Sequence, residues 1–190
     1  VLDLTATPKK ESNIISYVDA VQLKNEHMVK LPVIVYNRDS QSEVLIDAID
    51  LRNKLEEIAS AEYTKTGKYI RPIALFQAQP KGKEDATTFE KLRDKLVDAG
   101  IPAEQIAIRT ADVNELKNVE LMSPDCPIRY IITVNALKEG WDCPFAYILA
   151  SLANKTSQVD VEQILGRILR LPHTSQHTQS ALNMSYVLTS

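Results

Sequence analysis

Ile128-Arg129-Tyr130-Ile131-Ile132-Thr133-Val134 is the stretch that decides the fold, because it is the most strand-like run of the chain. It is rich in β-branched and aromatic residues, which favour strands. A nearly continuous run of this kind, without strict polar alternation, is typical of a strand whose two faces are both buried, as in a parallel sheet. The stretch therefore predicts a buried strand of an α/β domain.

On either side of this run, short apolar or β-branched segments alternate with longer segments of helical period, the pattern of βαβ units. One helix is expected from a capping box at Ser40-Gln41-Ser42-Glu43 to about Ala61, and another over 85–99, ended by Gly100. The pattern predicts a three-layer αβα domain with a mainly parallel sheet. Other strands are expected at 29–36, 69–76, 106–108, 146–152 and 184–188, with loops at 118–127 and 171–180.

Length and composition predict one globular domain over 1–190, since 190 residues with 44% hydrophobic content bury a sizeable core. The net charge of −3 argues against a broad basic field for nucleic acid, so any such contact is expected to be local. Cys126 and Cys143 are expected to be reduced thiols. The chain lacks an apolar run long enough to cross a bilayer and a secretory signal at its start, which predicts a cytoplasmic protein without membrane contact.

A second informative segment runs from Gln163 to Arg170, Gln-Ile-Leu-Gly-Arg-Ile-Leu-Arg. In a helix, Gln163, Gly166, Arg167 and Arg170 would share one face. Two guanidinium groups a turn apart match phosphate oxygens, although an ordinary amphipathic helix with solvated arginines has the same pattern. The opposite, apolar face would consist of Val161, Ile164, Leu165, Ile168 and Leu169.

Three further segments are expected at the carboxyl end of a strand or in the loop after it, where open α/β sheets bind ligands. The first is Leu4-Thr5-Ala6-Thr7-Pro8 and the second runs from Arg71 to Gln77. The third runs from Ile131 to Pro144, where a buried strand breaks into a turn with small and polar residues. Its Asp142 has a carboxylate that accepts hydrogen bonds from ribose hydroxyls.

In this order, and followed by Q-x-x-G-R-x-x-R, the segments resemble the late motifs of superfamily 2 helicases and translocases: the T-A-T motif (within 1–8) and motifs IV (71–77), V (131–144) and VI (160–170). The residue sequence N-A-L-K-E-G-W-D-C-P, positions 135–144, looks like motif V of type III restriction subunits and excision-repair helicases. The stretch 128–172 looks most like the restriction (Res) subunit of type III restriction-modification systems and its DEAD/DEAH-type relatives. The resemblance covers residues 4 to about 172.

This resemblance implies the second RecA-like lobe of a two-lobed motor. None of the five glycines lies in a G-x-x-x-x-G-K-[ST] P-loop, and an acidic D-E-x-H-like cluster is missing from the sequence. In the family those parts lie on the first lobe, which would hold ATP and Mg²⁺ and would precede the T-A-T motif. The implied partners are double-stranded DNA, the first lobe of the same polypeptide and a modification (methyltransferase) subunit.

Carried over to this sequence, the resemblance makes Arg167 and Arg170 arginine fingers that reach the γ-phosphate of ATP on the first lobe. Gln163 would couple the lobes or contact the nucleotide edge of the cleft, and Gly166 would allow a close approach beside the arginines. The chain alone is then expected to be inactive.

The resemblance also assigns residues of motif V to the nucleotide and to DNA. Asp142, with Gly140 and Glu139 nearby, would lie at the ribose. Thr133 or Asn135 would contact a backbone phosphate of DNA, and both remain candidates because Asn135 has the motif position while Thr133 has the more usual residue type. Gln77, at the end of motif IV, is a third candidate for contact with nucleic acid.

Two other functions fit the sequence. The chain could be the lobe of a DNA-repair or RNA-processing helicase, because the motifs hardly separate these enzymes from restriction motors. It could also be a non-catalytic nucleic-acid-binding module with the same fold. His173-x-x-x-His177 has a zinc-like spacing, but a third ligand does not accompany it, so a metal site is not expected.

Overall fold

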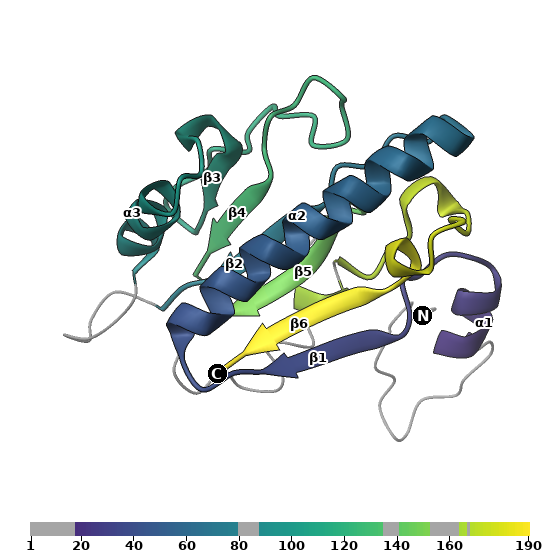
Figure 1. The fold of residues 1–190 in the computed structure, drawn as a ribbon, viewed down its shortest axis with the longest axis horizontal. Helices are drawn as coiled ribbons and strands as arrows, with labels where there is room; N and C mark the ends of the chain where they lie inside the picture. The colour runs from purple at the N-terminus through teal and green to yellow at the C-terminus, as the bar shows by residue number, and fades with distance from the viewer. Residues whose placement is uncertain (1–17, 80–87, 135–140, 153–163, 167) are drawn as a thin grey trace, which may run out of the picture.

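The computed structural model describes residues 18–79, 88–134, 141–152, 164–166 and 168–190. In these ranges six strands form one parallel sheet in the order β1-β6-β5-β2-β4-β3 (Figure 1), which confirms the predicted α/β class. The strands are β1 (Val33–Asn37), β2 (Ile73–Gln77), β3 (Ile106–Arg109), β4 (Tyr130–Thr133), β5 (Ala146–Ser151) and β6 (Ser185–Thr189). The helices are α1 (Ala20–Asn25), α2 (Gln41–Thr66) and α3 (Phe89–Asp98), with the 3₁₀ turns η1 (Ala103–Gln105), η2 (Pro172–Thr174) and η3 (Ser180–Asn183).

The strand order explains the three layers of the domain. From β1 through β2 to β3 the chain crosses the sheet in one direction, and from β3 through β4 and β5 to β6 it returns. Because crossovers between parallel strands are right-handed, the two sets of connections lie on opposite faces. Helix α2 lies across one face (Figure 1). Every residue of β2, β4 and β5 is buried, as expected for central strands of a covered parallel sheet.

Two strands begin later than the sequence predicts, in each case directly after a proline. β1 was expected from Val29 but begins at Val33, and β2 was expected from Tyr69 but begins at Ile73. Pro32 and Pro72 have no N–H to donate, so neither can extend a ladder toward the N-terminus. The residues ahead of each proline are therefore available for other contacts.

Helix α2 shows the predicted start but not the predicted end. The Ser40 hydroxyl accepts a hydrogen bond from the Glu43 N–H, whereas the Glu43 carboxylate accepts from Asp39 rather than Ser40, so the capping box is not reciprocal. The helix continues past Ala61 to Thr66 and ends at Gly67, whose φ of 71° favours glycine. Hydrogen bonds from Thr178 to buried Glu62 hold the extra turn, and these could not be read from local sequence.

At the carboxyl edge of the sheet, every described strand ends on a polar residue. The register aligns Arg109 with Thr133, Thr133 with Gln77, and Gln77 with Ser151. At the opposite end of the strand order, Asn37 of β1 is aligned with Thr189 of β6. The strands between these ends and the amino edge are apolar, so polar groups are concentrated at the two edges.

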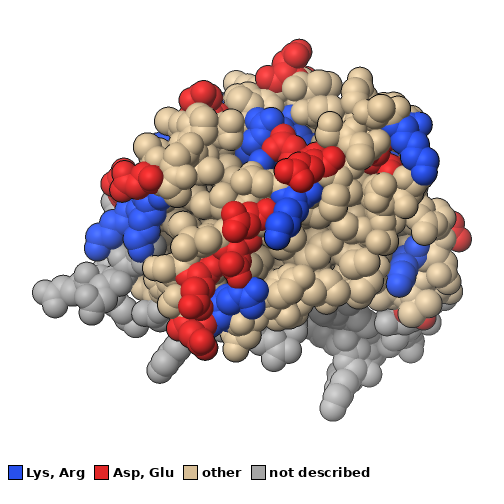
Figure 2. All heavy atoms as spheres, in the orientation of Figure 1, with Lys and Arg blue, Asp and Glu red and all other residues tan. Residues whose placement is uncertain are grey.

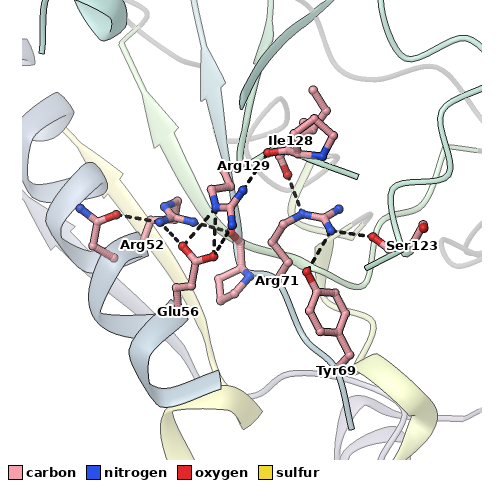
Figure 3. Close-up of polar contacts among 10 residues, drawn as sticks. Arg52, Glu56, Tyr69, Arg71, Ser123, Ile128 and Arg129 are labelled. Carbon is pink, nitrogen blue, oxygen red and sulfur yellow. Dashed lines mark hydrogen bonds and ion pairs between the residues drawn. The ribbon is translucent and has the colours of Figure 1, made fainter. Parts of the chain in front are cut away.

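At the amino edge, Arg71 is a buried cation with four acceptors (Figure 3). Its guanidinium donates to the carbonyl oxygens of Ile128 and Ser123, each at 2.8 Å, and to that of Leu121. It also donates to the Tyr69 hydroxyl at 3.3 Å. The predicted loop over 118–127 consists of turns and bends, and Arg71 fixes it to the sheet.

Beside Arg71 lies a partly buried network on α2 and β4 (Figure 3). Glu56 accepts hydrogen bonds from both Arg52 and Arg129. Burial raises the pKa of Glu56, but the hydrogen bonds and charges of Arg129 and Arg52 outweigh this effect and hold the pKa below its usual value. The network joins α2 to the start of β4.

We predict that Arg71→Met lowers the free energy of unfolding by about 3 kcal/mol, because it removes a buried cation that donates to three backbone carbonyl groups, among them the buried Ile128 carbonyl. Urea denaturation of the two proteins measures this difference. Arg38→Met is the matched control: Arg38 forms a partly exposed ion pair with Asp47, which is worth at most about 1 kcal/mol. Equal losses in the two variants would contradict the role assigned to Arg71.

Candidate functional site

The two sequence motifs of greatest interest meet in an ion pair at the amino edge of the sheet. The Arg170 guanidinium donates from Nη1 to Oδ2 of Asp142. The residues are 28 positions apart in the sequence. Their side chains are 60% and 38% exposed, respectively, so both remain accessible to a ligand. The structure thus brings together one predicted phosphate-binding residue and the predicted ribose-binding residue.

The segment before Arg170 is helical, as predicted, over the described positions 164–166 and 168. Ile164 and Ile168 are fully buried while Gly166 is exposed, so the predicted apolar and open faces are correct at these positions. A Cβ added at Gly166 would meet no atom within 4 Å among the described residues, which leaves room for a ligand beside it.

Arg170 itself does not continue the helix, contrary to the predicted i+7 position. It forms an antiparallel bridge with Val29, flanked by hydrogen bonds from Lys30 N–H to the Leu169 carbonyl and from Leu171 N–H to the Met28 carbonyl. These long-range backbone bonds replace the helical ones. Arg170 is therefore held by the segment that precedes β1.

Segment 131–144 was expected at the carboxyl end of a strand or in the loop after it. Thr133 is the last residue of β4, and Asp142 follows in the connection from β4 to β5. Asp142 lies four residues before Ala146, where β5 begins, so it is at the amino edge, whereas open α/β sheets usually bind ligands at the carboxyl edge. The two edges are separated by the length of a strand, roughly 17 Å.

The carboxyl edge contains the second group of predicted residues. Gln77 ends β2, and its side-chain oxygen accepts a hydrogen bond from the Ser151 hydroxyl at 3.2 Å. The connection from β2 leads toward β3, whereas those from β4 and β5 lead the other way, so Gln77 lies at a topological switch point of the sheet. Gln77 and Thr133 are both buried, and their contact with nucleic acid stays a prediction. Ser151 was missed because only the register reveals it.

Several predicted residues lie outside the described residues. They include the T-A-T segment within 1–8. The others are Asn135, Glu139, Gly140, Gln163 and Arg167.

Lys30 is the residue near the Asp142–Arg170 pair that sequence reasoning missed. It is fully buried, and its ammonium group donates to the carbonyl oxygens of Pro144 and Ala146, each at 2.7 Å. It also lies 4.4 Å from the centroid of the Tyr147 ring. Burial lowers the pKa of Lys30 to about 7, against the opposing effects of Cys143 and Asp142. A lone lysine before a short strand gives no sequence signal for such an environment.

The histidine pair at 173 and 177 is structural. The two rings lie 6.4 Å apart, edge to face, and His177 Nδ1 is 3.7 Å from the buried Glu62 carboxylate. Burial lowers the pKa of His177, which Glu62 partly offsets. Among the described residues, no group of three or more His, Cys, Asp or Glu side chains is placed to hold a metal ion.

No protein-family model matches the chain, and a search of curated proteins found no match. Within the described ranges, no helix has the length and apolar character needed to cross a membrane.

We predict that the stability of the chain depends on pH through Lys30. An unfolded lysine has a pKa near 10.5, so above pH 7 the unfolded state holds a proton that the folded state releases. The free energy of unfolding should therefore rise with pH. Between pH 7 and 9 it should rise by about 2 kcal/mol more in the wild type than in Lys30→Met.

Urea denaturation at several pH values measures this difference. The window ends near pH 9 because burial raises the pKa of Cys143 to about 11, which reverses the trend at higher pH. Parallel curves for wild type and Lys30→Met between pH 7 and 9 would contradict the prediction.

Proposed function

We propose that the chain is the second RecA-like motor lobe of an ATP-dependent DNA translocase or helicase, of the kind found in the restriction subunit of type III restriction-modification systems. The observation that carries this proposal is the ion pair between Asp142 of the motif V-like segment and Arg170 of the motif VI-like segment. The two segments were assigned to one nucleotide site from sequence alone. Their meeting at one edge supports a shared site there.

The exposure of the pair suits nucleotide exchange. An exposed ion pair contributes only about 0–1 kcal/mol, so a phosphate can replace Asp142 as the partner of Arg170 at little cost. The guanidinium fork binds phosphate oxygens in the same way as carboxylate oxygens. Once released, the Asp142 carboxylate can accept hydrogen bonds from a ribose hydroxyl. The residues present therefore fit the phosphate and ribose of a nucleotide.

In this proposal ATP and Mg²⁺ are held mainly by a first lobe of the same polypeptide. Bound there, Mg²⁺ would neutralise charge on the phosphates, while Arg170 and Arg167 would approach from this chain. A finger of this type contributes about 10³ to 10⁵ in rate, on the order of 4 to 7 kcal/mol of barrier. The other proposed partners are double-stranded DNA and a methyltransferase subunit, in the cytoplasm.

The charge distribution supports nucleic-acid contact at an edge of the sheet rather than on the α2 face. Acidic side chains gather over α2 (Figure 2), among them Glu43, Asp47, Asp50 and Glu57. Such a surface repels phosphate. The carboxyl edge, with Gln77 and Thr133, is the surface to which the resemblance assigns DNA. It lies a strand length from the Asp142–Arg170 pair, so nucleotide and DNA would be bound at separate edges.

We predict that Arg170→Ala, and likewise Arg167→Ala, lowers DNA-stimulated ATP turnover of the parent protein by hundreds-fold or more, because charge on the transferred phosphate loses its partner. Steady-state ATPase assays measure this effect. Arg170→Lys should recover only a part, since an ammonium group lacks the planar fork.

Arg38→Ala is the control, because it removes another partly exposed arginine–aspartate ion pair, beyond the carboxyl end of β1. It should leave turnover unchanged. Turnover of Arg170→Ala and Arg167→Ala within a few-fold of wild type would refute the finger assignment, and would favour a non-catalytic nucleic-acid-binding module.

We also predict that the 190-residue chain alone does not hydrolyse ATP and binds it weakly or not at all, because the proposed phosphate- and magnesium-binding groups belong to the first lobe. Isothermal titration with ATP and a phosphate-release assay test this. Hydrolysis by the purified chain that persists in Arg170→Ala would show a site other than the one proposed.

A further inference from the structure

The segments that carry Asp142 and Arg170 are joined by a third segment, residues 28–30. Its backbone binds the Arg170 strand through hydrogen bonds on both sides of the Val29–Arg170 bridge. Its side chain, that of Lys30, binds the carbonyl oxygens of Pro144 and Ala146, immediately after Asp142. The Lys30 carbonyl accepts a further hydrogen bond from the Ser185 hydroxyl, which fixes the residue to β6. Lys30 is thus bonded to both segments that carry the pair and to β6.

The ion pair itself is too exposed to hold these segments in place. A pair with side chains 60% and 38% exposed contributes little to stability. Lys30, by contrast, is fully buried, and its hydrogen bonds are charge-assisted, which makes them about twice as strong as neutral ones. The Tyr147 ring adds a cation–π contact.

We infer that Lys30 is a positioning residue, which holds the backbone of Asp142 and that of Arg170 at the separation required for the two side chains to meet. The importance of Lys30 for ATP hydrolysis rests on the function proposed above. Its effect on the Asp142–Arg170 ion pair does not depend on that function. Lys30 touches neither the nucleotide nor the Arg170 side chain in this account. It acts through the carbonyl groups that follow Asp142 and through the backbone that carries Arg170.

The charge of Lys30 is part of this role. A neutral amine has only two N–H groups and makes weaker hydrogen bonds to carbonyls, and it loses the cation–π contact. The pKa of Lys30, about 7, makes this loss measurable near neutral pH. The titratable groups that face it are Asp142, Cys143 and Tyr147. Burial raises the pKa of Cys143 to about 11 and that of Tyr147 well above its usual value, so neither changes charge between pH 6 and 8.5.

The test is rotation of the Arg170 guanidinium about its Nε–Cζ bond, measured by ¹⁵N NMR on the 190-residue chain. Asp142→Asn defines the rate when the pair is broken. Lys30→Met should accelerate rotation to a similar extent, about fivefold, and the double variant should rotate no faster than either single one. Lys54→Met, which removes an exposed lysine of α2, should leave the rate unchanged.

A lysine with a merely structural role would lower the unfolding midpoint without changing guanidinium rotation in the folded chain. Wild-type rotation in folded Lys30→Met would therefore overturn the inference. The wild type provides a second measurement that needs no substitution at Lys30. Between pH 6 and 8.5 its Arg170 rotation should accelerate, whereas that in Asp142→Asn should not. A pH-independent rate in the wild type would also overturn the inference.

Turnover of the parent protein separates this inference from the proposed function. Lys30→Met should lower kcat more than it changes KM for ATP, and should add little to the effect of Arg170→Ala. Full turnover in Arg170→Ala would overturn the proposed function but not the positioning role, which the NMR measurements decide. Slow turnover in Arg170→Ala with normal turnover in Lys30→Met would overturn the positioning role.

Discussion

The structure depends on one constraint: the central strands of a parallel sheet are buried on both faces, so their side chains must be apolar along nearly their whole length. Polar chemistry is then confined to the strand ends. The carboxyl edge holds a row of amides and hydroxyls with Arg109 at its end, and the amino edge holds the buried cations Arg71 and Lys30. The separation of the two proposed sites is a consequence of this constraint.

At the amino edge, buried cations bind backbone carbonyl groups that lie outside the hydrogen-bond ladder of the sheet. Each strand is entered from a loop whose carbonyl groups lie near the core and have no ladder partner. Arg71 binds three carbonyls of the loop before β4, and Lys30 binds two around the start of β5. Each cation lies just before a proline that delays its own strand. The same residues that shorten β1 and β2 are therefore available to fix neighbouring loops.

The apolar runs predicted all six strands, and the signal is clearest for the central strands, whose residues are buried on both faces. The run 128–134 became β4 and 146–152 became β5, each within a residue or two of the predicted bounds. The residues that build the site were less predictable. Asp142 was expected at a strand end or in the loop after it, but the sequence does not show where that loop crosses from the carboxyl edge to the amino edge. Arg170 is not part of the predicted helix because its backbone pairs with Val29, 141 positions earlier in the sequence. The periodicity of a helix contains no information on such a long-range contact.

The contrast between Arg71 and Arg170 shows what decides the role of an arginine. Both occur in segments that resemble helicase motifs, and both end in guanidinium groups at the amino edge. Arg71 donates to three backbone carbonyls, so displacing it would break several hydrogen bonds at once, including the buried one to Ile128. Arg170 has one described partner, an exposed carboxylate, which water or phosphate can replace. Under the proposed function, Arg170 must change partner in each catalytic cycle, which requires a weakly held side chain on a rigid backbone. The exposure of Arg170 suits the first requirement, and its backbone bridge to Val29, with the proposed role of Lys30, suits the second.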